Sequence, residues 1–478
     1  MTLIGAWIDA AAARGDGAVY LEEAGGAGQL TFGGLRRSVG AWDRYLDRAG
    51  VAPGGRVAIR LPDPLGYASA LAGILGAGRI AVPLDPGAPA AELDRVLGVA
   101  RPQAVLGSGL PPGLTVLTPP GPDGLAPSGT RSGGGIFLCT SGTTGTPKGV
   151  LLGADQLGHV AACVAQHHRL GPADRGYCCL PLFHVNAEVV GLLATLAAGA
   201  CLVLEAKFSR RRFWATIEQQ QVTWINAVPA IITLLAMEPP AVRPSARIRF
   251  VRSASAPLPP SVMRRFEQAF GIPVIETYGM TEAASMITAN PLDGPRKAGS
   301  AGLPAGAEVR VAGPSGPCPA FTVGRVQIRG RGVIKAYAVG GRPGAIDRGG
   351  WLDTGDLGHF DADGYLFLAG RSDDVINRGG EKIYPREIED FLLAQPGVRS
   401  AAVVAARDEV LGERPVAYVV PAVPGLRDQI GDALRVACEA ALPRPKRPAE
   451  FRLVEELPVG PTGKVSRGRL RELAAAHG

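Results

Sequence analysis

Hydrophobic and polar positions alternate between two kinds of segment along the first 280 residues. Short apolar runs are typical of buried strands, and longer Ala- and Leu-rich runs are typical of buried helices. Residues 56–60 predict a strand, residues 66–75 a helix that Gly76-Ala77-Gly78 ends, and residues 79–84 another strand. The same order returns in residues 191–205, where Ala198-Gly199 separates a predicted helix from a predicted strand. Repeated strand–helix–strand units favour sheets covered by helices, so the pattern predicts two related α/β subdomains.

Other short apolar runs extend this α/β prediction. A stretch rich in Gly, Pro and Ser, residues 108–135, predicts a loop between the two parts. The further predicted strands are residues 136–138, 150–152, 223–228, 248–255 and 272–275.

The pattern changes after about residue 370, where a smaller α+β unit is predicted. Pro385 opens a predicted helix over 385–395, with Ile388, Phe391 and Leu392 on one face. Residues 400–408 and 414–422 predict strands, and a basic helix follows Lys464. We therefore expect a large N-terminal domain, residues 1–370, with α/β subdomains and a small β-rich part. A small C-terminal domain, residues 371–478, follows it.

Composition excludes several classes of protein. Hydrophobic residues make up 46% of the 478, which is enough for large buried cores and argues against global disorder. The net charge of +7 is modest and forms no basic block, so neither nucleic acid nor a membrane surface is an expected partner. The longest apolar run, residues 189–204, is shorter than the roughly 18 residues of a membrane-spanning helix.

Cysteine and lysine usage adds two expectations. The seven cysteines are scattered and form no C-x-x-C pair, which argues against disulfide and zinc scaffolds. The N-terminus lacks the pattern of a signal peptide, so a cytoplasmic location is expected. Only seven of the 50 basic residues are lysines, so each lysine is a better candidate for a specific role than each arginine.

Residues 139–149 carry the strongest chemical signal. They place three glycines, five hydroxyl side chains and Lys148 within eleven residues, between two predicted strands. Glycines let backbone N–H groups approach a polyphosphate, while hydroxyls and a lysine add further donors. The order differs from the G-x-x-x-x-G-K-[ST] loop, because no Ser or Thr follows Lys148. We expect a phosphate-binding loop rather than a flexible surface loop.

Two further motifs offer nucleotide contacts. Residues 276–283, delivered by a predicted strand, hold Thr281 as a phosphoryl donor and Glu282 as a ligand for Mg²⁺, with Tyr278 as a flat face for a purine. A strand end followed by a helix cap is the alternative for this motif. Residues 350–358 place Asp356 in a predicted tight, glycine-flanked turn, where a carboxylate can hold both hydroxyls of a ribose; an Asx turn is the alternative.

The last two motifs lie in the C-terminal part. Residues 370–385 form a polar, glycine-rich stretch at the expected domain boundary, which suits a hinge or an ordinary linker. Residues 458–465 place Lys464 on a Gly/Pro turn, where an exposed loop lysine is the alternative.

Together and in this order, the five motifs resemble the AMP-forming acyl-adenylate (ANL) superfamily, which includes acyl-CoA synthetases, peptide-synthetase adenylation domains and beetle luciferases. The resemblance covers nearly the whole chain. It implies a large α/β domain and a small mobile α+β domain that turn about a hinge at Asp373. It also implies two half-reactions: a carboxylate attacks the α-phosphate of Mg·ATP, and a thiol then attacks the acyl-AMP.

The resemblance also implies roles for individual residues. Lys464 bridges the carboxylate and the α-phosphate, Glu282 binds Mg²⁺, and Thr281 contacts the α-phosphate. Gly379 and Gly380 line the tunnel for the pantetheine of coenzyme A. The expected ATP- and AMP-binding residues are Thr140, Ser141, Gly142, Thr143, Thr144, Gly145, Lys148, Ser255, Ala256, Pro257, Thr277, Tyr278, Gly279, Met280, Asp356 and Arg371.

Residues 181–188 favour the carboxylate–CoA ligase branch. Their Pro-Leu-Phe-His resembles the CoA ligases. The resemblance implies that the histidine of this motif, His184, packs near the acyl carbonyl and gates the thiol. Glu188 is the one acid here that could pair an amino-acid substrate, and we interpret it instead as a helix N-terminal residue. A carrier-protein thiol remains an alternative acceptor, and a catalytically inactive acyl- or nucleotide-binding module is the alternative of another class.

The acid itself is weakly encoded. Most candidate pocket positions are small and no obvious arginine lies among them, so a hydrophobic or bulky monocarboxylic acid is expected. The candidate positions are His159, Asn186, Val228, Ala230, Ser253, Thr277, Gly279, Met280, Ala284 and Ser285.

Overall fold

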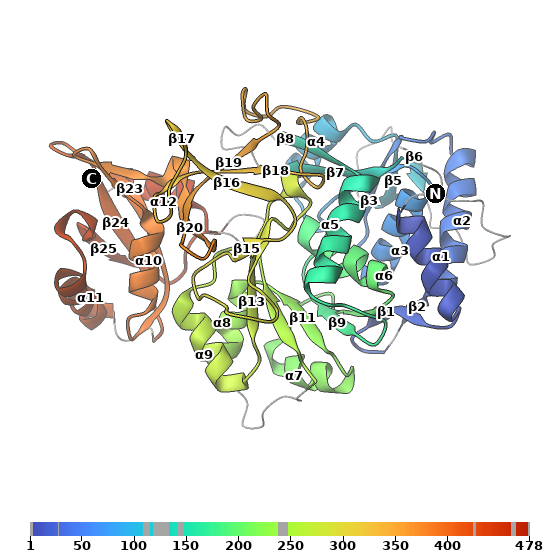
Figure 1. Ribbon diagram of the computed structural model, residues 1–478, viewed down its shortest axis with the longest axis horizontal. Coiled ribbons are helices and arrows are strands. Elements are labelled where there is room, and N and C mark those ends of the chain that lie inside the picture. Colours follow the sequence, from blue (N-terminus) through green and yellow to red (C-terminus); the bar gives the residue numbers. More distant parts are fainter. Residues whose placement is uncertain are drawn as a thin grey trace.

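The protein is described by a computed structural model with two large sheets, a smaller antiparallel sheet and a C-terminal unit (Figure 1). The N-terminal helices lie at one end and the C-terminal unit at the other. The structure describes residues 3–26, 28–108, 115–117, 133–140, 148–237, 247–423, 427–459 and 465–476.

The first large sheet has six strands in the order β6-β5-β3-β4-β7-β8. All its pairings are parallel except that of β7 with β8. One strand, β6, lies inside the stretch predicted as loop and pairs with β5; three residues are too short to stand out from their Gly- and Pro-rich surroundings. The elements are α2 (Phe32–Arg48), β3 (Arg56–Arg60), α3 (Pro64–Gly76), β4 (Ile80–Pro83), α4 (Ala90–Ala100), β5 (Ala104–Gly107), β6 (Thr115–Leu117), β7 (Gly135–Thr140) and β8 (Lys148–Gly153).

The second large sheet has nine strands, in the order β15-β14-β13-β12-β11-β9-β10-β1-β2. Its strands from β13 to β1 run parallel, and β1, near the N-terminus, pairs with β10 so that Leu21 lies opposite Leu202. The strands are β1 (Val19–Glu23), β2 (Gln29–Thr31), β9 (Arg175–Cys178), β10 (Cys201–Leu204), β11 (Trp224–Ala227), β12 (Phe250–Ser253), β13 (Val274–Tyr278), β14 (Thr288–Ala289) and β15 (Leu303–Pro304).

Helices cover both faces of the nine-stranded sheet. The helix predicted from residue 191 begins earlier in the structure, as the eight-residue π-helix η1, whose wider turns continue directly into α6. The helices are α1 (Leu3–Arg14), α5 (Ala154–His167), η1 (Asn186–Leu193), α6 (Ala194–Ala198), α7 (Arg210–Gln219), α8 (Pro229–Met237), α9 (Pro260–Phe270) and the short 3₁₀ helix η2 (Thr281–Ala283).

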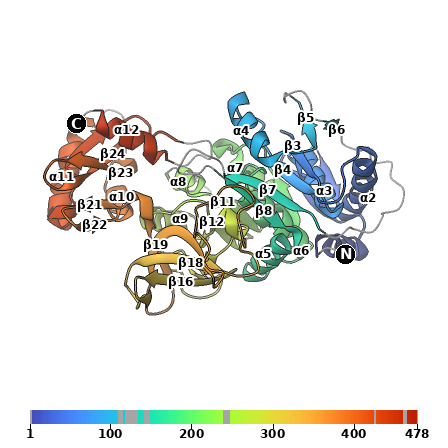
Figure 2. The same ribbon diagram turned by 90° about the horizontal axis from the view of Figure 1, so that it is seen from above.

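The largest buried cluster lies between the two large sheets. It combines Ile59 and Leu138 of the six-stranded sheet with Leu202 and Phe250 of the nine-stranded sheet, and helices α1, α2, α3, α5, α6 and η1 also contribute to it (Figure 2). The opposite face of the nine-stranded sheet packs against α7, α8 and α9 in a second cluster. The two predicted α/β subdomains are therefore confirmed, and they share one core.

Two glycines end the helices of the repeated units as the sequence predicts. Gly78 after α3 has φ +71° and Gly199 after α6 has φ +65°. This left-handed conformation stops each helix and turns the chain into the next strand at little steric cost for glycine.

The β-rich part of the N-terminal domain is an antiparallel sheet with the order β17-β16-β18-β19-β20. Its strands are β16 (Glu308–Gly313), β17 (Gly316–Pro317), β18 (Gly324–Arg329), β19 (Leu352–Phe360) and β20 (Leu366–Arg371).

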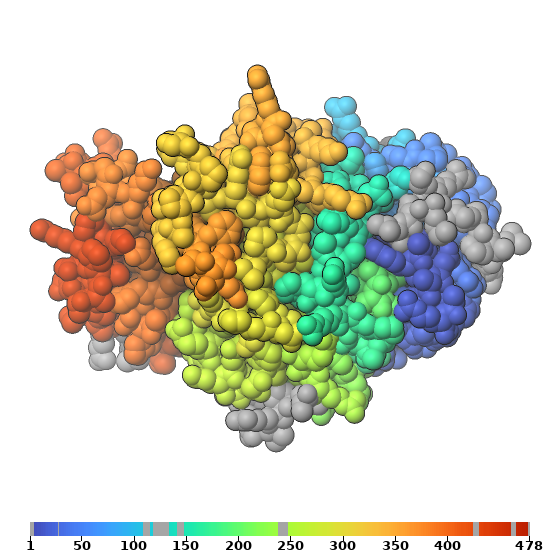
Figure 3. All heavy atoms as spheres, viewed as in Figure 1, coloured from blue at the N-terminus to red at the C-terminus, as the bar shows by residue number. Residues whose placement is uncertain are grey.

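The C-terminal unit has its own sheet and its own buried core, which confirms the predicted small α+β unit. It forms one end of the molecule in Figure 3. It meets the β-rich part where Arg386 donates to the carbonyl of Leu368 (3.0 Å). Its elements are the 3₁₀ helices η3 (Ser372–Asp374) and η5 (Arg444–Lys446), the strands β21 (Ile376–Arg378), β22 (Glu381–Ile383), β23 (Val398–Asp408), β24 (Gly412–Pro421) and β25 (Glu450–Leu453), and the helices α10 (Pro385–Leu393), α11 (Arg427–Ala441) and α12 (Arg467–Ala475).

Candidate functional site

The expected ribose carboxylate, Asp356, is fixed by two neighbours from different elements. Tyr278 at the end of β13 donates from its phenol to Oδ2 (2.5 Å), and Arg371 of β20 donates to Oδ1 (3.1 Å). Burial, together with the charge of Asp356, raises the pKa of Tyr278 well above its usual value, so the phenol remains a donor. Three residues expected to bind nucleotide are thus brought together.

The local backbone of Asp356 differs from the expectation. Asp356 lies within strand β19, opposite Arg371, rather than in a tight turn. Gly355 has φ +77°, and a Cβ there would lie 2.7 Å from Nη2 of Arg371. The glycine therefore makes room for the guanidinium, and the Gly-flanked pattern that suggested a turn reflects an irregular strand.

The segment after β13 folds tightly on itself. A Cβ on Gly279 would lie 1.1 Å from the carbonyl oxygen of Ser285, so only glycine fits there. The carbonyl of Met280 accepts hydrogen bonds from the backbone N–H groups of Ala283 and Ser285. This fold places Thr281 and Glu282 directly after Tyr278, on η2.

Glu282 is 7% exposed, and Tyr337 donates to its Oε1 (3.0 Å). The ammonium of Lys148, at the start of β8, lies 5.6 Å from the centre of the Tyr337 ring. Tyr337 thus connects Glu282, the expected metal ligand, with Lys148, the lysine of the phosphate loop. Sequence analysis missed Tyr337 because it lies in no motif.

Mg²⁺ fits this place as a partner of ATP. The described part of the chain contains no cluster of three or more His, Cys, Asp or Glu side chains that could hold a metal ion by itself. Mg²⁺ in nucleotide sites is commonly held by one or two carboxylates plus substrate phosphates, and Glu282 offers one such carboxylate.

Several expected site residues lie outside the described residues: Ser141, Gly142, Thr143, Thr144 and Gly145 of the phosphate loop, and Lys464. The two ends of that loop are described. Thr140 ends β7 and pairs with Lys148 at the start of β8, so these two expected site residues lie opposite each other.

One expected acyl-binding residue, Asn186, contacts the expected adenine-binding segment, residues 255–257. Asn186 begins η1, two residues after His184, and donates from Nδ2 to Oγ of Ser255 (3.3 Å). Ser255 has φ +73° and is exposed, as are Ala256 and Pro257. Ser253 and Thr277 are buried at the ends of β12 and β13, where Thr277 donates to the carbonyl of Ser253 (3.1 Å).

The other expected acyl positions are spread over three elements. Val228 follows β11, and Ala230 is exposed on α8. Ala284 and Ser285 are buried with positive φ angles, just after η2. His159 on α5 lines a separate open pocket of about 410 Å³ with Cys163 and Arg331, which none of the other expected acyl positions lines.

Arg252 is the residue that sequence analysis overlooked on this side. It is 1% exposed on β12, next to Ser253, and Nη1 donates to Oδ1 of Asn186 (2.7 Å) and of Asn226 (3.1 Å). Arg252 is not one of the candidate pocket positions, but it contacts Asn186 and precedes Ser253, which are two of them. A charged residue in an otherwise apolar parallel strand was the available signal.

Glu188 is fully buried in the first turn of η1, and Tyr67 of α3 donates to its Oε1 (2.7 Å). Burial raises the pKa of Glu188 to about 8, against the opposing effect of the hydrogen bond from Tyr67. Glu188 therefore joins two helices, which supports its interpretation as a helix N-terminal residue rather than a substrate ligand.

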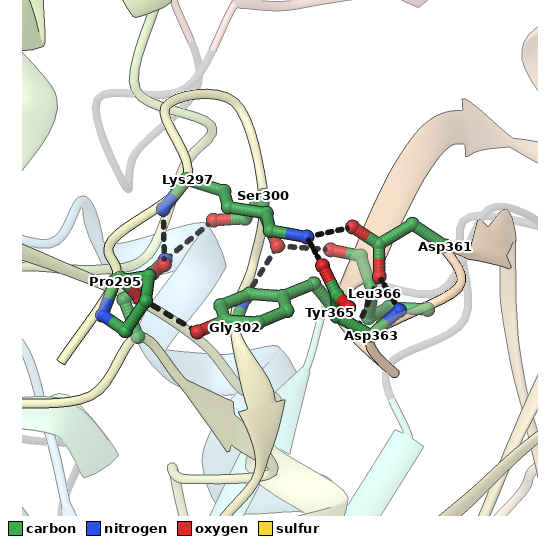
Figure 4. A network of polar contacts seen from close by, with 9 residues as sticks. Pro295, Lys297, Ser300, Gly302, Asp361, Asp363, Tyr365 and Leu366 are labelled. Atoms are coloured by element: carbon green, nitrogen blue, oxygen red, sulfur yellow. Dashed lines mark hydrogen bonds and ion pairs between the residues drawn. The ribbon is translucent and has the colours of Figure 1, made fainter.

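Lys297 holds the strands that carry Asp356 and Arg371 against the rest of the site (Figure 4). Its ammonium lies 2.5 Å from Oδ2 of Asp361 and 2.6 Å from Oδ2 of Asp363, in the turn between β19 and β20. It also lies 4.4 Å from the centre of the Tyr365 ring, and Tyr365 donates to the carbonyl of Pro295 (2.6 Å). One of the seven lysines thus has a structural role.

The C-terminal motif residues lie at turns. Gly379 (φ +60°) and Gly380 (φ +91°) connect β21 and β22, and the positive angles of this hairpin turn by themselves favour glycine. Asp373 lies in η3, where its carbonyl accepts from Arg471 of α12 (3.2 Å).

Family models match most of the chain. A model described as AMP-binding enzyme matches residues 8–122 and 136–338, and one described as AMP-binding enzyme C-terminal domain matches residues 387–464. Among the described residues, no helix is both long and apolar enough to cross a membrane.

Curated relatives match over nearly their whole length. A sulfoacetate–CoA ligase from Cupriavidus necator is 40% identical, with 92% of each chain covered. An oxalate–CoA ligase from Arabidopsis thaliana is 34% identical, with 89% of this chain and 90% of that protein covered.

Solved structures share the fold. ATP-bound MatB from Rhodopseudomonas palustris has a TM-score of 0.87 and 28% identity, with 99% of each chain covered. The o-succinylbenzoate coenzyme A synthetase of Bacillus subtilis, in complex with ATP and magnesium ion, has a TM-score of 0.84 and 28% identity, covering 97% of this chain and 98% of that one.

Proposed function

The chain belongs to the AMP-binding enzyme family, and from this premise we propose that it is an ATP-dependent, AMP-forming carboxylate–CoA ligase. In the first half-reaction a carboxylate oxygen attacks the α-phosphorus of ATP and pyrophosphate leaves. In the second, the thiol of coenzyme A loses its proton and attacks the acyl carbonyl, and AMP leaves.

The observation that carries this proposal is the convergence of two sets of residues on one short segment. Tyr278 joins Asp356 and Arg371, and Glu282, four residues later, joins Tyr337 beside Lys148. The proposed ribose-binding carboxylate, Asp356, and the proposed metal-binding carboxylate, Glu282, are thereby both tied to residues 278–282, as a site for one nucleoside triphosphate requires. The names of the full-length relatives, both CoA ligases, support the same activity.

The roles of the chain's own residues follow from charge and position. Asp356 would accept hydrogen bonds from the ribose hydroxyls, and Ser255, Ala256 and Pro257 would border the adenine. Glu282 would hold Mg²⁺, which supplies charge neutralisation of the phosphates when bound. Lys464 would place a cation between two anions that must meet, which lowers the barrier to their reaction.

Coenzyme A is the acceptor we propose. His184 would gate the approach of the thiol beside the acyl carbonyl, and the C-terminal unit would turn about Asp373 to bring Gly379 and Gly380 to the pantetheine. Acyl transfer to a carrier protein is the second candidate, for which the relatives' names give no support. The seven cysteines are free thiols, which supports the proposal of a cytoplasmic location.

Two observations point to different classes of acid. Sequence analysis predicts a hydrophobic or bulky monocarboxylic acid, whereas the two relatives are named for sulfoacetate and oxalate, acids with two acidic groups each.

A pyrophosphate-release assay over a panel of carboxylic acids, with and without coenzyme A, tests the function. We expect release to need both ATP and an acid, and an acyl-CoA to appear only when coenzyme A is present. A folded protein that activates no acid would instead indicate an inactive binding module, and acyl transfer only to a phosphopantetheinylated carrier protein would indicate the second candidate.

A further inference from the structure

Arg252 is a buried cation without a buried anion. Two other arginines at most 9% exposed lie close to carboxylates: Arg79 pairs with Asp43 and Asp47, and Arg386 with Asp390. For Arg252, 1% exposed, no carboxylate of the described residues lies within ion-pair distance, and Nε has no hydrogen-bond partner among them. Burying a guanidinium in this way is unfavourable unless a compensating charge arrives from elsewhere.

The groups that face Arg252 are all neutral. Burial, followed by the charge of Arg252, lowers the pKa of His168 and of His167 below the usual value. Burial raises the pKa of Cys178 to about 11, so its thiol stays protonated. Asn186 and Asn226 supply only amide oxygens. The cluster therefore carries a net positive charge at neutral pH, although burial lowers the pKa of Arg252 itself to about 9.

The hydrogen bonds also fix which way the Asn186 amide points. A guanidinium has donors and no acceptor, so the oxygen of Asn186 must face Arg252. Its Nδ2 then points away from Arg252 and reaches Oγ of Ser255 at 3.3 Å. Asn186 thus presents a polarised N–H donor at the start of η1, two residues after His184, toward the segment that borders the expected acyl and nucleotide sites.

This inference rests on the proposed CoA-ligase function and specifies its substrate. We propose that the acid carries a second anionic group, a carboxylate or a sulfonate. Asn186 contacts this group directly, and Arg252, on the other side of Asn186, compensates its negative charge. Asn186 is then a specificity-determining residue, and Arg252 is a positioning residue that acts through it. The bulky monocarboxylic acid expected from sequence is the competing alternative.

Pairs of acids with the same shape and different charge separate the two possibilities. Malonate is compared with isovalerate, and sulfoacetate with tert-butylacetate, by ATP–pyrophosphate exchange, which needs no coenzyme A. We expect kcat/KM for the doubly charged acid to exceed that of its partner by about 10- to 100-fold, the range for a hydrogen bond to a charged group. Equal rates, or faster exchange with the singly charged analogues, would overturn the inference and leave the ligase function standing. A protein that activates none of the four acids and none of a wider panel overturns both.

Variants then test the part that Arg252 plays. Arg252→Met removes the charge and keeps much of the volume, and it should lower the ratio of kcat/KM for malonate over isovalerate by about 10-fold or more, chiefly through the KM of malonate. Arg252→Lys should restore most of that ratio. Arg175→Met is the control, because Arg175 lies on the same sheet and pairs with Glu22; it should leave the ratio unchanged. A ratio that stays constant in folded Arg252→Met assigns Arg252 a purely structural role and refutes this part. Since the comparison of acids uses the wild-type protein, it decides the substrate class even if a variant fails to fold.

Discussion

The phenol of Tyr278 donates to Oδ2 of Asp356 across 2.5 Å, joining the end of a parallel strand to the middle of an antiparallel one. The two residues are 78 positions apart in the chain, and they belong to different sheets. The carboxylate proposed to hold the ribose is therefore oriented by the residue proposed to border the adenine.

Tyr278→Phe tests this connection. The ring remains and the hydrogen bond is lost, so we expect the KM for ATP to rise roughly 10-fold while the KM for the acid changes little. Tyr365→Phe is the control, because its phenol contacts the carbonyl of Pro295 instead. Steady-state kinetics with each substrate varied in turn provide the measurement. An unchanged KM for ATP would show that Asp356 needs no help from Tyr278.

Glu282→Gln keeps the shape of the side chain and removes its charge. A hard divalent cation prefers a carboxylate, so half-maximal adenylation should require several-fold more Mg²⁺. Tyr337→Phe removes the hydrogen bond to Oε1 and leaves the charge, and it should shift the Mg²⁺ titration much less. If both variants shift the titration equally, Glu282 acts through its contact with Tyr337 and not as a metal ligand.

Lys464→Ala should lower the rate of adenylation by roughly 10²- to 10³-fold, the scale for one preorganised group that stabilises a transition state. Thioester formation from supplied acyl-AMP should persist, because Lys464 has no part in that step. Lys446→Ala serves as the control, since Lys446 pairs with Glu387 on the surface of the same unit. Equal losses in both half-reactions would refute the role of Lys464.

Asp373→Pro should affect the opposite half-reaction. Proline restricts φ and would hinder rotation at the proposed hinge, so acyl-AMP should form normally and thioester should form slowly. Asp373→Ala keeps the backbone free and should retain both rates. Rapid-quench measurement of each half-reaction distinguishes them, and full overall turnover of Asp373→Pro would place the hinge elsewhere.

Glu188 predicts how stability depends on pH. Burial raises its pKa in the folded state to about 8, above the ordinary value of 4.5. Between these values the folded protein holds a proton that the unfolded chain has released. The free energy of unfolding should therefore fall as pH rises from 4.5 toward 8, by up to about 1.4 kcal/mol per pH unit from this group.

Urea denaturation of Glu188→Gln at several pH values provides the check. The amide cannot ionise, so the slope in this range should become shallower than in the wild-type protein. An unchanged slope would assign the pH dependence to other groups.

The architecture could be predicted from local sequence patterns. The turns after α3 and α6 were predicted because Gly78 and Gly199 sit where a helix must give way to a strand, and each has the left-handed φ that this requires. Such signals need only a few neighbouring residues, which is why the two α/β subdomains could be inferred from one sequence.

Contacts between distant segments limited the prediction of the site. Tyr337 reaches Glu282 across 55 positions, and Arg252 reaches Asn186 across 66. Neither pairing has a local pattern, because the folded sheets bring the partners together. Asp356 was placed in a turn since glycines on both sides predict one, whereas Gly355 serves to admit Arg371 within a strand.

The pairing of β1 with β10 has a consequence for how the protein is made. Leu21 leaves the ribosome about 180 residues before its partner Leu202, a delay of roughly 10 to 40 s at ordinary rates of translation. Throughout that time Tyr20 and Leu21, both buried in the finished sheet, have no strand to pair with on that side. Residues 19–23 are therefore a segment of the nascent chain to which a chaperone has time to bind before the sheet is complete.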